Sequence, residues 1–184
     1  GNELRRMVCD HRRLRARGGG TKSALSAAVQ GVETVELSRL TGVVEYDPAE
    51  YTFTALAGTP VAEVSKLLDS HGQYLPFDPP FVDAGSTLGG TVASGLSGPG
   101  RYRYGGVRDF ILGVGLVDGA GKWVQAGGKV VKNAAGYDIP KLVVGGLGEL
   151  GVLVELTFKV FPRANAHLTV ELHVSSLLAA MEAF

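Results

Sequence analysis

Cysteine is nearly absent, since Cys9 is the one thiol in 184 residues. A single thiol excludes an intramolecular disulfide framework and a zinc or iron–sulfur site built from several cysteines. Because Cys9 falls on a predicted helix, we expect it to be a buried structural thiol. The four histidines (His11, His71, His167 and His173) are scattered and lack metal-ligand spacing. We therefore expect no metal site, and the pattern assigns no catalytic base.

An excess of charge of one sign is also lacking, because 18 Lys and Arg balance 18 Asp and Glu. This balance argues against a protein held to nucleic acid or to a membrane surface by bulk charge. No apolar run is long enough to cross a bilayer, and no signal-peptide pattern is present. We expect a soluble, cytoplasmic protein. Six arginines within residues 5–17 form a local basic patch, either a solvated helix face or a subunit contact.

Glycine, by contrast, is abundant, with 27 residues, about twice the usual share. Nineteen of them lie from Gly85 to Gly151, without a collagen period. The apolar content of 45% is too high for a linker. Glycine at this density inside a folded domain indicates backbone in unusual conformations or backbone close to a ligand.

The first 75 residues alternate short helical and strand patterns. Strands are predicted over residues 13–17, 32–37, 43–46 and 51–57, and helices over residues 3–12 and from residue 60 to just before residue 72. Thr59 is the predicted N-cap of the second helix, Pro60 its first residue and Gly72 its C-terminal cap. These elements predict a small α+β subdomain over about residues 1–75.

Residues 76–106 are rich in Gly, Pro, Ser and Thr and too long for an ordinary connector, so we expect a functional loop. A hairpin is predicted over residues 110–118 and 122–125, and a strong strand over residues 150–161. The tail, residues 165–184, has the pattern of a strand followed by a helix that begins at Ser176. The tail ends without a stop signal, so we expect the chain to be cut from a longer one.

The first motif is Arg17-Gly18-Gly19-Gly20-Thr21-Lys22, directly after a predicted strand. Three glycines let successive backbone N–H groups point at one anion, and Thr21 and Lys22 add a hydroxyl and a positive charge. A flexible turn is an equally good interpretation of this motif alone. It is not a Walker loop, because the six-residue frame before Gly-Lys is missing.

The second motif runs from Gly85 to Gly95, where small hydroxyl residues alternate with glycines. Its backbone could pass close to a ligand while the hydroxyls donate hydrogen bonds, or it could be a small-residue turn in the core. Two glycine loops in one domain favour a cofactor that carries a diphosphate.

Two further motifs are weaker. Gly146 to Gly151 reads as GxGxxG, but a strand-like segment follows it where a Rossmann fold needs a helix, so we reject that interpretation. Lys129 to Asp138 brings a Lys, an Asn, a Tyr and an Asp together around a glycine, and they either line a polar pocket or form a solvated loop.

In this order, the motifs resemble the FAD-binding domain of the vanillyl-alcohol oxidase and p-cresol methylhydroxylase superfamily. The chain is most similar to the FAD-binding E subunits of bacterial glycolate oxidases. The resemblance covers about residues 3–164 and implies an α+β fold of p-cresol methylhydroxylase type, with FAD between two α+β subdomains (about residues 1–75 and 76–164). Residues 165–184 would then begin a truncated C-terminal cap domain or form a tail.

The resemblance also implies a cofactor site. Its residues are Arg17, Gly18, Gly19, Gly20, Thr21, Lys22, Pro79, Gly85, Ser86, Thr87, Gly89, Gly90, Thr91, Gly95, Asp109, Gly151 and Val152. Residues 17–22 match the first pyrophosphate loop, residues 85–91 match the second, and Gly151 and Val152 match the segment whose backbone meets the flavin ring. Members that bind FAD covalently usually carry His where this chain has Thr21, so we expect non-covalent FAD. Leu147 replaces the acidic residue of catalytic D subunits, which is closer to the E-subunit pattern.

The implied activity is that of an FAD-dependent oxidoreductase that oxidises a 2-hydroxy acid by hydride transfer to the flavin. The implied partners are a catalytic FAD subunit and a separate iron–sulfur subunit, with membrane association only through such a complex. No catalytic residue is assigned, because the cap domain of this superfamily usually supplies much of the substrate site. Two alternatives stay open: a non-catalytic assembly subunit with weak or no FAD binding, and an FAD-dependent oxidase of another alcohol.

Overall fold

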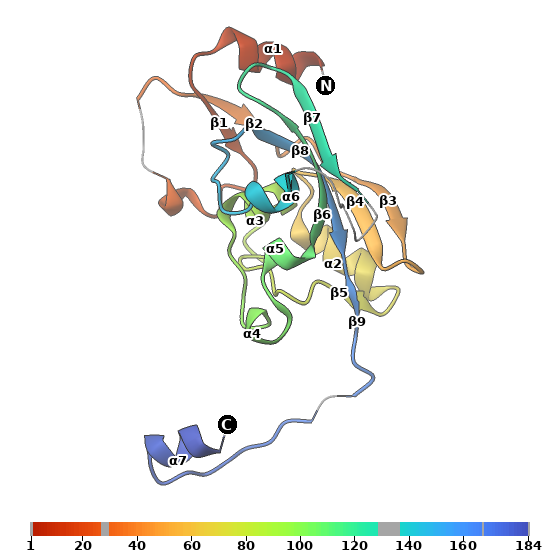
Figure 1. Cartoon of the computed structure of the whole chain (residues 1–184), viewed down its shortest axis with the longest axis vertical. Helices are drawn as coiled ribbons and strands as arrows, with labels where there is room; N and C mark the ends of the chain where they lie inside the picture. Colours follow the sequence, from red (N-terminus) through yellow and green to blue (C-terminus); the bar gives the residue numbers. More distant parts are fainter. Residues whose placement is uncertain (1, 27–29, 129–136, 167, 184) are drawn as a thin grey trace.

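The computed structural model describes residues 2–26, 30–128, 137–166 and 168–183, and its helices and strands confirm the α+β class (Figure 1). In chain order the elements are α1 (Asn2–Asp10), β1 (Leu14–Arg17), the 3-10 turn η1 (Ser23–Leu25), β2 (Glu33–Glu36), β3 (Val43–Asp47), β4 (Thr52–Leu56), α2 (Val61–Asp69), β5 (Gln73–Tyr74), α3 (Leu88–Ser94), α4 (Arg101–Tyr104), α5 (Val107–Phe110), β6 (Ile111–Val117), β7 (Trp123–Gly127), α6 (Ile139–Leu142), β8 (Val152–Lys159), β9 (Phe161–Pro162) and α7 (Leu177–Glu182).

The larger part of the fold is built on a five-stranded antiparallel sheet with the order β3-β4-β8-β6-β7. Its middle strand, β8, pairs with β4 on one side and with β6 on the other. Strands β3 and β4 precede residue 75 and the other three follow it. The sheet therefore joins strands from both sides of the expected subdomain boundary, and the boundaries near residues 75 and 164 stay predictions.

The main core lies between this sheet and the helices α2, α3 and α5. Four phenylalanines hold its centre: Phe53 stacks on Phe158 with ring centroids 5.5 Å apart, and Phe77 lies 5.6 Å from Phe110 and 6.2 Å from Phe158. Helix α3 contributes Leu88 and Val92, both with no exposed surface. Burial of these side chains fixes α3 against the sheet, and α3 in turn carries one wall of the site.

The smaller part consists of α1 and the parallel pair β1 and β2. Val8 of α1 is buried with Val35 and Leu37 from the β2 side and with Val117 and Val152 from the large sheet. This second core joins the two parts at the end of β6 and β8 that lies near α1 (Figure 1). Strand β1 stops at Arg17, so the first glycine motif begins where the β1–β2 ladder ends.

The structure corrects two expectations about helices. Residues 76–106 are not one long loop, because they contain α3 and α4. The helix expected from Pro60 begins at Val61 instead, with Pro60 at the N-cap position. Thr59 does not cap this helix: its hydroxyl accepts from the Gly42 N–H (3.0 Å) and donates to the Gly42 carbonyl (3.2 Å).

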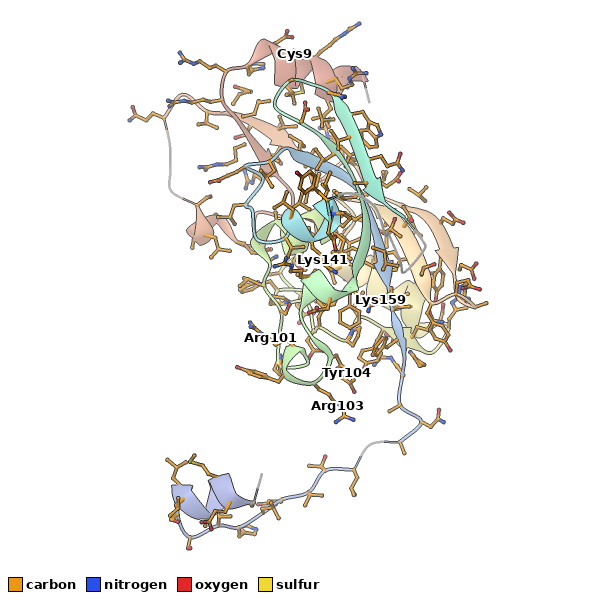
Figure 2. All side chains as sticks on the ribbon, in the orientation of Figure 1. Cys9, Arg101, Arg103, Tyr104, Lys141 and Lys159 are labelled. Carbon is orange, nitrogen blue, oxygen red and sulfur yellow. The ribbon has the colours of Figure 1, made fainter. Side chains whose placement is uncertain are left out.

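Two expectations about exposure and the tail are also wrong. Cys9 is exposed, because α1 turns it away from the second core (Figure 2). Residues 168–174 form no strand, because no other described strand lies beside them to pair with. The expected helix does form, as α7. The tail that carries it runs away from the rest of the fold (Figure 1). No helix within the described residues is long and apolar enough to cross a membrane.

Candidate functional site

Two adjoining cavities lie beside β1, and Arg15 and Ala16 of this strand line both of them. The smaller, of about 410 Å³, surrounds residues 17–22 and reaches α3. The larger, of about 630 Å³, extends from the end of α1 to residues 147–152. The two share Arg15, Ala16, Leu25, Ser26 and Leu147 as lining residues. The two cavities therefore adjoin along a shared wall.

The first glycine motif packs directly on the second. A Cβ atom on Gly19 would overlap the carbonyl oxygen of Gly85, and one on Gly18 would overlap the hydroxyl of Thr87. Neither Gly18 nor Gly19 has a positive φ, so the requirement for glycine is steric. Bare backbone at these two positions lets the loop lie flat on the second motif and face the smaller cavity.

The backbone N–H groups of residues 18–22 donate no hydrogen bond to any residue in the described part of the chain. They stand around the smaller cavity, which all these residues line. Successive N–H groups without internal acceptors form a concave site for an anion. The loop therefore offers several donors to a ligand that carries phosphate oxygens.

Lys22 adds a positive charge that the fold does not neutralise. Its side chain is half-buried, and burial lowers its pKa below the ordinary value. Its Nζ contacts the Thr21 hydroxyl (3.3 Å) and the Phe81 ring (5.6 Å to the centroid), and no carboxylate among the described residues pairs with it. Arg17 differs, because Glu36 lies 3.5 Å from its guanidinium. A partly desolvated cation without a counter-ion favours binding of an anion at this point.

The second motif supports the first loop, and little of it faces the cavities. The N–H groups of Leu88 and Gly89 donate to the carbonyls of Thr59 (3.0 Å) and Ala57 (2.7 Å), and the Gly90 N–H donates to the Thr87 hydroxyl (3.2 Å). The first turn of α3 is thus satisfied within the fold. Of the predicted residues 85–91, Thr87 and Gly90 line the smaller cavity.

Several other predicted residues lie behind the loop or away from it. Gly85 supports Gly19, Gly89 packs on Ala57, and the Thr91 hydroxyl donates to the Thr87 carbonyl (3.0 Å). Ser86 is fully buried, and its Oγ has no hydrogen-bond partner among the described residues.

Three predicted residues, Pro79, Gly95 and Asp109, line neither cavity. Asp109 accepts from the Gly106 N–H (2.9 Å) and caps α5, and Gly95 ends α3 with φ +66°. Gly151 and Val152, by contrast, do line the larger cavity.

The fourth motif lies mostly outside the described residues, at positions 129–136. Of its last two residues, Tyr137 is exposed, and Asp138 caps α6 by accepting from the Lys141 N–H (3.2 Å). The Lys141 ammonium, 3.0 Å from the Asp138 carboxylate, is the main cause that lowers the pKa of Asp138. Neither residue lines a cavity.

Sequence reasoning missed Arg15, Ser94 and Leu147 as site residues. Arg15 could have been found, because it lies two positions before Arg17 on a strand and therefore on the same face. Ser94 lies in the second motif, but the resemblance did not assign it, and α3, the helix that carries it, was not predicted. Leu147 belongs to the rejected GxGxxG motif, and the resemblance noted it only as the replacement for the acidic residue of catalytic D subunits.

Residues 3–127 match the family described as FAD binding domain. The chain belongs to this family. It is 42% identical to the glycolate oxidase subunit GlcE of Escherichia coli over 94% of this chain and 49% of that protein. It is 32% identical to the D-2-hydroxyglutarate dehydrogenase of Xanthomonas citri pv. viticola over 78% of this chain and 30% of that protein. The chain thus spans about half, or less, of these curated relatives.

A solved structure of alkyldihydroxyacetonephosphate synthase matches 90% of this chain and 31% of its own length, with a TM-score of 0.72 and 25% identity. The family and this fold confirm the resemblance to the vanillyl-alcohol oxidase and p-cresol methylhydroxylase superfamily and the expected cofactor, FAD. The geometry fits this cofactor independently, because a Cβ-free loop, N–H groups without acceptors and a Lys22 without a counter-ion among the described residues suit a diphosphate.

We expect Thr87→Ala to lower the free energy of unfolding of the FAD-free protein by about 1 kcal/mol, the usual value of an N-cap. The Thr87 hydroxyl caps α3, and the loop that carries Gly18 rests on it. Urea denaturation measures the loss. Thr87→Ser is the control, because it keeps the hydroxyl and should stay within a few tenths of a kcal/mol of the wild type. An equal loss in both variants would assign the effect to the methyl group.

Proposed function

We propose that this chain is the FAD-binding part of an oxidoreductase of the glycolate oxidase type and that residues 17–22 hold the diphosphate of FAD. The observation that carries the proposal is the half-buried Lys22 beside the N–H groups of residues 18–22, none of which has a partner of opposite character in the described part of the chain. Thr87 and Gly90 close this site from α3, and Gly85, Ser86, Gly89 and Thr91 hold α3 and the loop in register. Gly151 and Val152, which line the larger cavity, contact the flavin ring of the cofactor with their backbone.

The attachment is non-covalent. Thr21 stands where covalent members of the resembled superfamily usually carry His. The smaller cavity has no His, Cys or Tyr among its described lining residues. His11 lines the larger cavity, but its Nδ1 is engaged with the Met7 carbonyl (2.9 Å). These observations favour a cofactor held by hydrogen bonds and charge alone.

The substrate class is a 2-hydroxy acid. Several relatives are named as glycolate oxidase subunits, as D-2-hydroxyglutarate dehydrogenases or as a D-lactate dehydrogenase. When bound, FAD supplies the two-electron acceptor for such an oxidation. The residues of this chain bind and orient it.

The partners are a catalytic FAD subunit and an iron–sulfur subunit, with the complex in the cytoplasm or associated with the membrane through its other subunits. The tail supports a further protein contact, because Leu168, Val170, Leu172 and Val174 alternate along it and are all exposed. We propose that residues 165–184 begin a cap domain that covers these side chains.

The test is an absorption spectrum of the purified protein before and after acid precipitation. We expect flavin bands that move into the supernatant and are identified there as FAD. Flavin that stays with the pellet would contradict the non-covalent attachment. A colourless protein that takes up no added FAD would contradict the proposal and favour a non-catalytic assembly subunit. Flavin that no 2-hydroxy acid reduces, even with the partner subunits present, would contradict the substrate class.

A further inference from the structure

Phe81 combines a bulky aromatic side chain with a backbone conformation that suits glycine. Its φ is +62°, in the left-handed region that bulky L-residues rarely adopt. The residue lies in the turn between the two prolines at positions 79 and 80 and the second glycine motif. Strained conformations persist where the surrounding structure over-determines them, and they cluster at functional sites.

The fold holds Phe81 in this conformation through backbone hydrogen bonds. Its carbonyl accepts from the Ser86 N–H (3.0 Å), and the carbonyl of the next residue, Val82, accepts from the Gly85 N–H (3.0 Å). Core packing does not account for the aromatic ring, because Phe81 is 50% exposed and belongs to neither hydrophobic core of the described residues. The reason for a phenylalanine here therefore lies outside the core.

The ring of Phe81 lies beside the ammonium group of Lys22. The distance from Nζ to the ring centroid is 5.6 Å, within the range of a cation–π interaction. A Cβ atom on Gly90 would stand 4.0 Å from the same Nζ, so the ammonium also lies close to α3. Lys22 ends the first motif, whereas Phe81 precedes the second motif and Gly90 belongs to it. The cation of the first motif is thus held against the second.

The contact between Lys22 and Phe81 is a product of the fold. In other pairs of this kind, such as Arg103 and Tyr104, the two residues are neighbours in the sequence, and the chain itself keeps them close. Lys22 and Phe81 are far apart in the sequence and meet where the two glycine motifs pack together. Phe81 lines neither cavity, so its ring reaches the site through Lys22.

We propose that Phe81 is a positioning residue whose ring holds the Lys22 ammonium in place for the diphosphate of FAD. The inference rests on the proposed function, which places the diphosphate on residues 17–22. A lysine has a long, flexible stem, and a binding partner that must order it loses affinity. Because the ring orders Lys22 before the cofactor arrives, less entropy is lost when the cofactor binds.

The experiment is a double-mutant cycle between Phe81 and Lys22, with FAD affinity measured by isothermal titration. We expect Phe81→Leu to raise the Kd for FAD about five-fold in the wild-type background, because binding must then order the lysine. In the Lys22→Met background the same substitution should change the Kd by less than about two-fold, because the ammonium that the ring positions is gone.

Two further variants separate the aromatic ring from the strained backbone. Phe81→Tyr keeps an aromatic face and should bind FAD more tightly than Phe81→Leu. Tyr51→Leu is the matched control, because Tyr51 has a φ of +55°, is 41% exposed and lines neither cavity. This control should keep the FAD affinity of its parent in both backgrounds.

Wild-type affinity in Phe81→Leu would overturn the inference. An equal loss in the two backgrounds would also overturn it, because Phe81 would then support the turn ahead of the second motif and not Lys22. A Phe81→Tyr variant that binds as weakly as Phe81→Leu would exclude the ring as the cause. If the wild type itself binds no FAD, the proposed function fails along with the inference, whereas equal losses in proteins that do bind FAD remove the inference alone.

Discussion

Replacement of Gly19 by valine is expected to abolish FAD binding at concentrations that saturate the wild type. A Cβ atom at this position would overlap the carbonyl oxygen of Gly85, which is backbone and cannot rotate away. The first loop would have to lift off the second motif, and its N–H groups would no longer converge on the diphosphate. Loss of two charge-assisted hydrogen bonds, at about 1.5 kcal/mol each, corresponds to an affinity about 100-fold weaker. Isothermal titration with FAD measures the effect.

Gly128→Val is the control for Gly19→Val. A Cβ atom on Gly128 meets nothing within 4 Å among the described residues, its φ is not positive, and it lines neither cavity. This variant should keep the wild-type affinity for FAD. Gly19→Ala should fall close to Gly19→Val, because the first carbon atom already causes the overlap. Wild-type affinity in Gly19→Val would show that the two motifs can separate without harm to the site.

Elements with a strong local pattern were predicted well. The strand expected over residues 150–161 is β8, and the hairpin expected over residues 110–118 and 122–125 is β6 and β7. Apolar alternation and turn residues are local properties, so the sequence displays them directly. The strand order of the sheet, by contrast, depends on pairing between segments that are far apart in the sequence. Strand β4 pairs with β8 across most of the chain, with Thr52 opposite Lys159, and no local pattern announces this pairing.

Helix α3 shows why other elements could not be predicted. Its seven residues, Leu88–Ser94, include two glycines and two hydroxyl residues, which are poor helix formers. Tertiary contacts override this preference: the Thr87 hydroxyl caps the first turn, and the Gly89 N–H donates to the Ala57 carbonyl. Gly89 is required because a Cβ atom there would press on the Ala57 backbone. Gly89 thus lowers the helix propensity of the segment, yet it allows α3 to pack against Ala57.

The candidate site was predictable to the extent that it is one continuous segment. Residues 17–22 carry glycines, a hydroxyl and a cation directly after a strand, so the sequence offered an anion site there with a flexible turn as an equal alternative, and the second glycine loop then favoured a diphosphate cofactor. The second motif looked similar, yet most of it supports the first loop and does not face the cavities. The carbonyls of Thr59 and Ala57 already accept hydrogen bonds from the N–H groups at the start of α3, so these donors are not available to a ligand. These acceptors lie about thirty positions earlier in the chain. Only the fold shows that they satisfy the motif.

Lys22→Met is expected to weaken FAD binding about 10- to 100-fold, the range for loss of one interaction with a charged group. The FAD-free variant should be at least as stable as the wild type, because it no longer buries a cation without a counter-ion. Lys22→Arg is the control: it keeps the charge and should bind FAD more tightly than Lys22→Met. Equal affinities of Lys22→Met and the wild type would remove Lys22 from the site.

The pH dependence supplies an independent test of Lys22, since burial lowers its pKa below the ordinary value of 10.5. As pH rises through this lowered pKa, the native state releases a proton that the unfolded chain still holds. The unfolded state then binds more protons, so the free energy of unfolding of the FAD-free protein should increase over this range. FAD affinity should fall over the same range, because a neutral amine attracts the diphosphate less.

The part of each slope that comes from Lys22 should be absent from Lys22→Met. The difference between wild type and variant therefore separates Lys22 from the ionisation of the flavin itself, which contributes equally to both proteins. Chemical denaturation and FAD titration across the alkaline range measure the two slopes. A wild type whose stability rises more and whose FAD affinity falls more with pH than in the variant would assign both the burial cost and the anion contact to this one ammonium group. Equal pH profiles in the two proteins would contradict that assignment.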